Sequence, residues 1–449
     1  MDAQQQQEEL KTLQEKYQAR AEALGAELGV RLSETAKQET SALPFVRSRD
    51  SAGTQPSDAC LVRVLQWNIL AGGLSNDGFL VRNILRETSD KDFQTVVEQV
   101  VKARENGEDM QVLKEKLASP ESSVNHSIVL DWSLRWTRMQ LYIAVAVPDI
   151  ITMQEMDHMC QAEQDLGRLG YDCALPGRRY CAAHDNMENY MSNRADPPTF
   201  FKHLTQTGAA FVPKTNSQCR LLGGGDDDGV AVFWRRDVFE VARVEFLVYE
   251  DAKRNQGAVR VRLRHRAKGT EMSVICAHLN SGSSAKDEQK RLHQWCDGSL
   301  SQDGGRTGPS LKEWFTESAE SIPTLCCMDS NSAPGQQFEL WKELCCLSAE
   351  GADNLWTGYY DAEGRNTEAP APVTTNKMRG PLSGQPKKIG EHACGAIDNI
   401  VFSKHLAVAQ FAWKPLTYAT EEEALEDLLP SLNVPSDHMP VIVDFKLDV

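Results

Sequence analysis

The chain has 449 residues, of which 48 are Lys or Arg and 64 are Asp or Glu, so its formal net charge at pH 7 is −16. With 41% hydrophobic and 25% charged residues, the composition is that of a globular protein and excludes disordered and fibrous classes. The absence of any apolar run of about 18 residues excludes a membrane span, and the acidic balance argues against a broad electrostatic grip on nucleic acid.

Residues 1–60 are predicted to form a polar helix followed by a linker. Apolar side chains recur at helical spacing between Glu, Gln and Lys, at Leu10, Leu13, Tyr17, Leu24, Leu28 and Leu32. This pattern favours a helix that is solvated or packed at the edge of a domain, and it leaves open a coiled coil with a protein partner. The linker is expected at residues 41–60, which carry Ser, Pro and Asp.

The N-terminal sequence and the cysteines together favour an intracellular location. The opening MDAQQQQEEL lacks the apolar core of a signal peptide, and its early acidic residues are atypical of a transit peptide. The 12 cysteines include the adjacent pairs Cys326-Cys327 and Cys345-Cys346, which suit buried thiols better than a disulfide framework. We therefore expect an intracellular protein and favour the cytoplasm over the nucleus.

Residues 61–449 are predicted to form one strand-rich α/β domain with two sheets. A strand near 62–68 is followed by a polar stretch of about 75–130, with helix-like segments near 93–104 and 109–118. An amphipathic helix from Trp132 to Val147 then leads into a buried strand at 149–155. Further strands are expected at 229–234, 241–249, 257–264, 272–278, 323–328, 396–402, 408–413 and 439–446, and helices near 285–300, 310–319 and 335–345.

Six of these strands carry Asp, Glu, Asn or His at one end. The residues are Asn68, Glu155, His278, Asp329 with Asn331, Asp398, and Asp437 with His438. A single acidic residue at a strand end is usually a turn former, so the prediction depends on all six ends converging. Carboxylate and amide oxygens suit Mg²⁺ or Mn²⁺, and the histidines add proton-transfer groups. Together they indicate metal-assisted phosphoester hydrolysis.

The same residues carry a resemblance to the endonuclease/exonuclease/phosphatase superfamily. The matching motifs, in order, are Trp67-Asn68, Gln154-Glu155, His278-Leu279, Asp329-x-Asn331, Ile397-Asp398 and Ser436-Asp437-His438. Two secondary motifs resemble the deadenylase branch, which includes nocturnin-like enzymes and carbon-catabolite-repressor-type poly(A) nucleases. They are Glu288-x-x-Arg291-x-x-Gln294 and Thr374-Thr375-x-Lys377-x-Arg379. The resemblance implies a four-layer sandwich of two mixed β-sheets flanked by helices. Residues of about 75–130 depart from it as a helical insertion beyond the family's usual connection.

The resemblance also implies roles for the site residues. Glu155 would be the main ligand of Mg²⁺, or of Mn²⁺, assisted by Asn68 and Asp437. Asp329 would align or activate the attacking water, and Asn331 would hold the scissile phosphate. His438, paired with Asp398, would stabilise the phosphoryl transition state. His278 would contact the phosphate, and Lys377, Arg379 and Arg291 would bind substrate.

Some positions depart from the branch and leave the substrate open. Asn280, Asn376 and Asn399 stand where the resemblance leads us to expect Lys, Trp and Tyr, respectively. The expected activity is that of a 3′–5′ exoribonuclease of deadenylase type. The alternative is a 2′-phosphatase on a small nucleotide such as a phosphorylated nicotinamide dinucleotide. The partner would then be an RNA 3′ end or that nucleotide.

Two segments have an ordinary and a functional interpretation. The insertion at 75–130 is either a solvated helical hairpin or a lid or partner surface near the site. The basic segment 260–268 is either a track for an RNA chain or a solvent-facing strand of ordinary charge.

Overall fold

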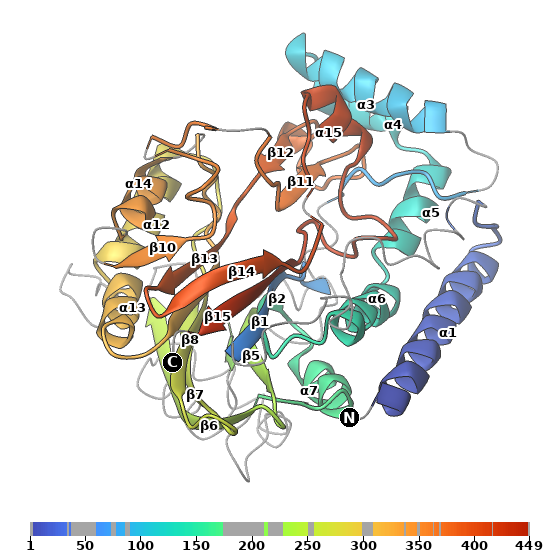
Figure 1. Ribbon diagram of the computed structural model, residues 1–449. Helices are drawn as coiled ribbons and strands as arrows, with labels where there is room; N and C mark the ends of the chain where they lie inside the picture. Colours follow the sequence, from blue (N-terminus) through green and yellow to red (C-terminus); the bar gives the residue numbers. More distant parts are fainter. Residues whose placement is uncertain are drawn as a thin grey trace, which may run out of the picture.

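The computed structural model describes most of the chain, namely residues 3–33, 36, 60–72, 78–85, 90–173, 211–213, 228–249, 256–298, 309–335, 338–347, 351–361, 363–367, 370–414 and 416–447. In these ranges two large β-sheets pack against each other, and helices lie on their outer faces (Figure 1). The linker expected at 41–60 lies outside the described residues except for Cys60. No helix among the described residues combines the length and apolar character that a membrane crossing requires.

The first sheet has the order β14-β15-β1-β2-β5-β3, with β4 paired to β5. Strands β1 and β2 are parallel, and all the other pairs are antiparallel. The bounds are β1 Cys60–Asn68, β2 Ile150–Met156, β3 Tyr171–Asp172, β4 Phe211–Pro213, β5 Gly229–Arg235, β14 Leu406–Phe411 and β15 Val441–Leu447.

The second sheet has the order β10-β13-β9-β8-β7-β6, and its one parallel pair is β8 with β9. Its bounds are β6 Phe239–Tyr249, β7 Gln256–His265, β8 Glu271–His278, β9 Thr324–Asp329, β10 Ala352–Asn354 and β13 Asp398–Ser403. Strand β9, with the sequence TLCCMD, is buried along its whole length, as expected for a strand covered on both faces. The register pairs Asp329 with His278 on one side and with Asp398 on the other. Each sheet therefore contributes the polar end of a central parallel pair.

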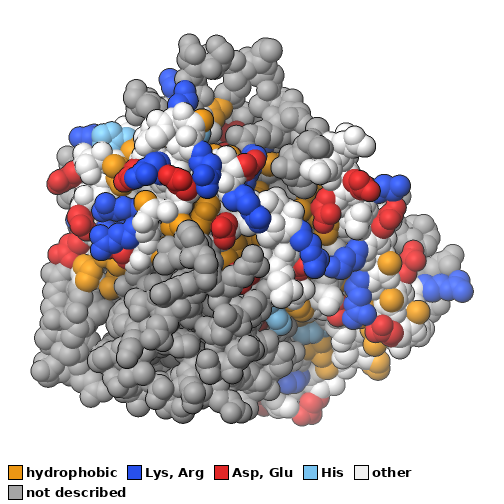
Figure 2. Space-filling view, turned by 90° about the horizontal axis from the view of Figure 1, so that it is seen from below, with side chains coloured by type: hydrophobic (Ala, Val, Ile, Leu, Met, Phe, Trp, Pro, Cys, Tyr) orange, Lys and Arg blue, Asp and Glu red, His pale blue; other side chains and the backbone are white. Residues whose placement is uncertain are grey.

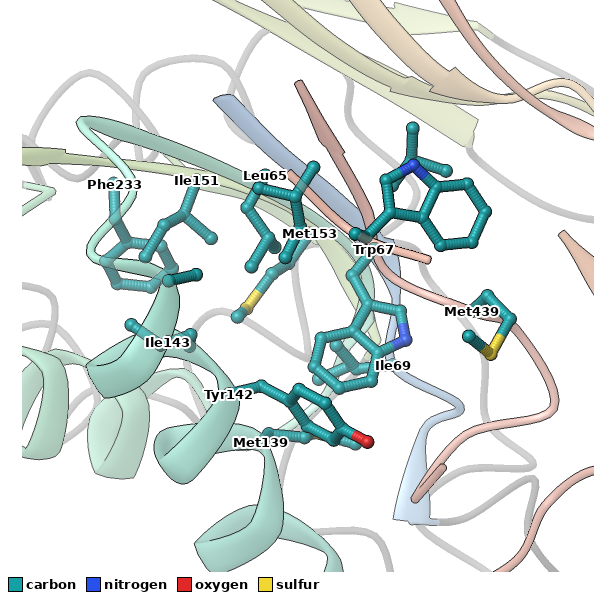
Figure 3. Packing of buried hydrophobic residues seen from close by; sticks show 14 of the residues in the cluster. Leu65, Trp67, Ile69, Met139, Tyr142, Ile143, Ile151, Met153, Phe233 and Met439 are labelled. Atoms are coloured by element: carbon teal, nitrogen blue, oxygen red, sulfur yellow. The ribbon is translucent and has the colours of Figure 1, made fainter. Parts of the chain in front are cut away.

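Helices complete four layers, as the sequence predicted. Helices α6 (Trp132–Ala146) and α7 (Met159–Arg168) lie beside the first sheet, whereas α12 (Ala285–Cys296), α13 (Leu311–Ala319) and α14 (Phe338–Cys346) lie beside the second (Figure 1). Figure 3 shows Met139, Tyr142 and Ile143 of α6 directed toward Trp67 and Met153 of the first sheet. The predicted four-layer α/β sandwich of two mixed sheets is confirmed.

The N-terminal helix α1 (Ala3–Glu27) packs along α6. Its apolar residues Leu13 and Tyr17 are buried, and the Tyr17 hydroxyl donates a hydrogen bond to the carbonyl of Leu432 at 2.9 Å. Arg20 pairs at 2.8 Å with Asp131, which caps the N-terminus of α6. The chain itself therefore covers the apolar face of α1, and a protein partner would have to use its polar face.

The described residues between β1 and α6 form three helices, α3 (Asp90–Glu105), α4 (Met110–Leu117) and α5 (Pro120–Val129), of which α5 was not expected. Helices α3 and α4 lie near α15 (Glu421–Glu426) and a separate hairpin of β11 (Thr375–Met378) and β12 (His392–Gly395) (Figure 1). Apolar side chains of α3, α4 and β11 form one buried cluster, and Leu425 of α15 packs against it. The helices thus pack on the hairpin as well as facing solvent.

Candidate active site

Strands β1 and β2 deliver Asn68 and Glu155 to the polar edge of the first sheet. The amide nitrogen of Asn68 donates to Glu155 Oε1 at 3.2 Å and to Asp329 Oδ2 at 2.8 Å. The backbone N–H of Ala71 donates to Glu155 Oε2 at 3.1 Å. Glu155 is only half-buried. Its carboxylate is therefore held in one orientation while it stays within reach of a ligand.

Three residues at the polar ends of the strands have a strained backbone. Leu70, Glu155 and Asn331 have positive φ values of 54°, 57° and 52°. A side chain in this left-handed region costs about 1 kcal/mol or more. At Glu155 the pairing of β2 with β5 also shifts register, which re-aims a side chain as a β-bulge does. Such strain persists where the surroundings impose a functional geometry.

Asp329 lies at the centre of the arrangement. Its Oδ2 is 3.4 Å from His278 Nε2, and its Oδ1 accepts the backbone N–H of Asn331 at 2.9 Å. Burial alone would raise the pKa of Asp329, but His278, His438 and the hydrogen bond from Asn68 lower it below the ordinary value. The group is therefore an ionised carboxylate that can orient a water molecule.

His438 and Asp398 form a buried pair. His438 Nδ1 lies 2.8 Å from Asp398 Oδ2, and the side-chain amide of Gln66 donates to Asp398 Oδ1 at 2.7 Å. Burial alone would lower the pKa of His438, but Asp398 and Asp437 raise it to about 9. At neutral pH the ring is therefore an imidazolium. Its Nε2, 3.9 Å from Asp329 Oδ2, can donate a hydrogen bond toward the centre of the site.

Lys377 reaches the same centre from the β11–β12 hairpin. Its ammonium pairs with Asp437 and lies 3.5 Å from His438 Nε2. Burial opposes ionisation of both partners, but their attraction raises the pKa of Lys377 and lowers that of Asp437 to about 2. Lys377 therefore remains cationic beside the carboxylates and could meet a substrate phosphate.

The other two basic residues predicted to bind substrate lie differently. Arg379 follows β11, with its guanidinium carbon 5.8 Å from the centre of the Phe79 ring. Arg291 is fully buried in α12, where it donates to Glu288 and to the carbonyls of Asn280 and Gly282, each of the two carbonyls at 2.8 Å. Arg291 is thus enclosed and supports the loop that follows His278, and its contact with substrate stays a prediction.

Sequence reasoning gave no role to two residues that support the site. Arg135 of α6 is buried and donates to the carbonyls of Ile69 and Pro435, which lie next to Asn68 and Ser436. The Thr374 hydroxyl accepts the backbone N–H of Asp398 at 3.1 Å. A signal existed for Arg135, because an Arg on the apolar face of an amphipathic helix needs a buried partner.

The donor set fits a hard divalent cation at Glu155. The ligand atoms of Asp329, Asp398 and His438 lie within 4.8 Å of one another, which is the one such group among the described residues. His438 is a poor ligand, however, because its ring is protonated and committed to Asp398. The carboxylate of Glu155 and the side-chain oxygen of Asn68, which also accepts the Leu70 N–H at 3.0 Å, are donors of the kind that Mg²⁺ and Mn²⁺ prefer. Asp437, the further ligand that the resemblance implies, is paired with Lys377.

Comparison with known proteins finds relatives of this chain by sequence and by structure. No family model matches the chain. It is 23% identical to Drosophila melanogaster nocturnin over 437 residues, covering 90% of this chain and 58% of the relative. It is 26% identical to Homo sapiens nocturnin over 398 residues, covering 87% of this chain and 66% of the relative. The chain thus spans less than two thirds of the length of these curated relatives.

Two solved structures are also similar. The human nocturnin catalytic domain with bound sulfate is 19% identical, with a TM-score of 0.47, and the match covers 88% of this chain and all of that one. ANGEL2, a 2′,3′-cyclic phosphatase in complex with adenosine-2′,3′-vanadate, is 15% identical, with a TM-score of 0.49 and coverage of 88% and 98%. The sequence similarity to nocturnins along most of the chain confirms the resemblance to the deadenylase branch of the endonuclease/exonuclease/phosphatase superfamily.

Proposed function

We propose that the chain is a divalent-metal-dependent hydrolase that cleaves phosphoesters by attack of water. The observation that carries the proposal is the meeting of Glu155, Asp329 and the Asp398–His438 pair at the polar edges of both sheets. One carboxylate is open to a ligand, one is ionised and central, and one holds an imidazolium. These are the groups that a phosphoryl transfer to water requires.

The residues divide the work as follows. Glu155 and Asn68, with Asp437, would hold Mg²⁺ or Mn²⁺, which when bound would offset the negative charge on the phosphoryl oxygens. Asp329 would orient the attacking water. His438 would donate its Nε2 proton in a hydrogen bond to a phosphoryl oxygen as negative charge grows there.

Three further residues would contact the phosphate. His278 and Asn331 both lie against Asp329, and the Asn331 amide donates at 3.1 Å to the carbonyl of Leu279. Lys377 adds a positive charge beside Asp437 and His438. A phosphate near Asp329 would thus meet donors from both β-sheets and from the hairpin.

The first substrate class is an RNA 3′ end, cleaved in a 3′–5′ exonucleolytic reaction of deadenylase type. It is supported by the resemblance of the motifs around Glu155, Lys377 and His438 to that branch and by the similarity to nocturnins. Such a substrate needs few base-specific contacts if only its terminal phosphoester is bound at the site.

The second class is a small phosphorylated nucleotide, from which a 2′-phosphate would be removed. The pairing of the arginines in the basic segment 260–268 favours this class. Arg260 of the basic segment is buried and pairs with Glu245 and Glu317, each at 2.9 Å. Arg264 pairs with Glu271 at 2.7 Å, at the end of β8 opposite His278 and about 23 Å along the strand from it. In the view of Figure 2, from below, basic and acidic side chains are interspersed over the described part of the visible face. A track for a long RNA chain is thus not supported there.

One assay tests both classes. Purified protein is incubated with oligo(A) RNA and, separately, with a 2′-phosphorylated nicotinamide dinucleotide, in Mg²⁺, in Mn²⁺ and in excess EDTA. We expect cleavage of at least one substrate with metal and none with EDTA. The ratio of the two kcat/KM values assigns the substrate class. Cleavage of neither substrate, or full activity in EDTA, would refute the proposed function.

The rate should also depend on pH through His438. Its pKa of about 9 lies above the ordinary 6.5, so the imidazolium is the main form below pH 9 and is lost above it. We expect kcat to fall on the alkaline side with a midpoint near 9. In Asp398→Asn this midpoint should move to lower pH, because the carboxylate that most raises the pKa of His438 is gone. An unchanged midpoint in that variant would contradict the pairing.

A further inference from the structure

The hairpin that supplies Lys377 belongs to neither large sheet. Strands β11 and β12 form a two-stranded sheet of their own, and one isolated bridge joins Thr375 of β11 to His438. The hairpin is tied to the catalytic sheets at its base, where the Met439 N–H donates to the Thr374 carbonyl and the Thr375 hydroxyl to the Asp437 carbonyl, both at 2.7 Å. Residues 379–391 connect β11 to β12, and their described backbone bonds go to each other or to Gly78 in the stretch after β1. The connecting residues are therefore held from outside the two large sheets.

The polar stretch after β1 provides that support through backbone bonds. The Leu80 N–H donates to the Met378 carbonyl at 2.8 Å, and the Gly380 N–H donates to the Gly78 carbonyl at 2.8 Å. These bonds lie on either side of Arg379, which forms an antiparallel bridge with Phe79. The insertion thus contacts the hairpin from Met378 onward, directly after Lys377.

Apolar packing reinforces these bonds. Leu80, together with Val97 and Val100 of α3, is buried in one cluster with Met378 and Ile389 of the hairpin. At Gly390, where φ is 76°, an added Cβ would lie 3.0 Å from Val100 Cγ1. The positive φ and the close approach of helix and hairpin together favour glycine at this position.

Polar bonds hold the return arm of the hairpin. Arg104 of α3 donates to the carbonyls of Ile389 at 2.8 Å and Lys387 at 3.2 Å, and it lies 3.4 Å from a carboxylate oxygen of Glu391. The ammonium of Lys114 on α4 donates to the Ser383 carbonyl at 2.7 Å. The insertion is thus bonded both to the residues that follow β11 and to those that precede β12.

The hairpin is held from the other side as well. The Asn376 amide donates to the carbonyls of Ala424 and Asp427 at the end of α15, at 2.7 and 2.9 Å, and its oxygen lies 2.8 Å from His392 Nε2. Asn376 directly precedes Lys377. Asn376, which stands where the branch leads us to expect Trp, therefore bonds the hairpin to α15. The insertion holds the hairpin on its other side.

We propose that α3 and α4 are a positioning element that fixes the hairpin and so sets the Lys377 ammonium against Asp437 and His438. The inference rests on the proposed function, since it assigns Lys377 a part in binding substrate phosphate. It makes the insertion a determinant of substrate affinity although none of its described side chains bonds to Glu155, Asp329 or His438. The residue at its centre is Arg104, which bonds the hairpin while its side chain stays 39% exposed.

The test is a double-mutant cycle between Arg104 and Lys377. Arg104→Ala is expected to raise KM for the better substrate about tenfold with a smaller change in kcat, because the phosphate-binding cation is displaced. In a Lys377→Met background the same Arg104→Ala change should have no further effect on KM. Equal effects in both backgrounds would overturn the proposal, since a general structural role adds independently of Lys377.

Lys102→Ala is the matched control, because it removes an exposed basic residue from the same turn of α3, where the described contacts show no bond to the hairpin. Its KM should equal that of the unaltered protein. A second readout does not need activity. Amide hydrogen exchange of residues 379–391 should become faster in Arg104→Ala and stay unchanged in Lys102→Ala. Unchanged exchange in Arg104→Ala overturns the proposal, whereas failure of the unaltered protein on both substrates refutes the proposed function alone.

Discussion

Replacing Glu155 by Ala is expected to lower the rate of phosphoester hydrolysis by about 10³-fold, while the folded state persists. The carboxylate is the one oxygen pair of the site that is both fixed, by Asn68 and Ala71, and partly open to ligands. Without it, the remaining oxygen donors are bonded to Lys377, Asn68 or His438. Initial rates in saturating Mg²⁺ measure the effect, and isothermal titration with Mn²⁺ measures the accompanying loss of metal affinity.

Two controls separate the chemistry from the backbone. Glu422→Ala removes an exposed carboxylate on α15 and should leave the rate unchanged. Glu155→Gly removes the same carboxylate as Glu155→Ala but tolerates the φ of 57°, so it should be more stable than the Ala variant by about 1 kcal/mol. Full activity of purified Glu155→Ala would show that the site is elsewhere.

The long strands and their polar ends could be predicted because each carries a complete local signal. β8 and β9 are continuous apolar runs that end in His278 and Asp329, and both signals lie within a few adjacent residues. Their convergence followed from parallel pairing, which brings carboxyl ends to one edge of a sheet. The predicted residues Asn68, Glu155, Asp329, Asp398 and His438 indeed form one bonded network.

The supporting contacts could not be predicted, because they join segments far apart in sequence. β11 and β12 have four residues each, which is too short for a period to be recognised. Arg291 matches a motif shared with substrate-binding enzymes, but only its burial in α12 shows that it serves the loop after His278. Likewise, α3 is mostly polar, so its sequence does not show that its few apolar side chains pack against the hairpin.

The same limit applies to the basic segment at 260–268. Alternation of Arg along a strand indicates one face of like charge, and the sequence alone does not show which acidic residues pair with it. Its partners Glu245 and Glu317 come from β6 and α13, which only the folded sheet brings beside Arg260. A pattern of charge in sequence therefore predicts surface potential only after the neighbouring strands are known.

Replacing His438 by Gln is expected to lower kcat by about 10²- to 10⁴-fold. Gln can keep a hydrogen bond to Asp398 and fills much of the same space, so the loss reflects the positive charge and the Nε2 donor directed at the phosphoryl group. The buried Asp398 then lacks its counter-charge and should bind a proton more readily. Steady-state rates at pH 7 measure the loss, and the alkaline limb with its midpoint near 9 should vanish with the ring.

The pair acts as a unit, and this gives the decisive comparison for His438. Asp398→Asn alone should cost less than His438→Gln, because the ring stays in place and Asp437, which also raises its pKa, remains. Once His438 is Gln, Asp398→Asn should cost almost nothing more, since the carboxylate acts through the ring it holds at 2.8 Å. If the two losses instead multiply, Asp398 contributes to the reaction independently, and the imidazolium is not the group that Asp398 maintains.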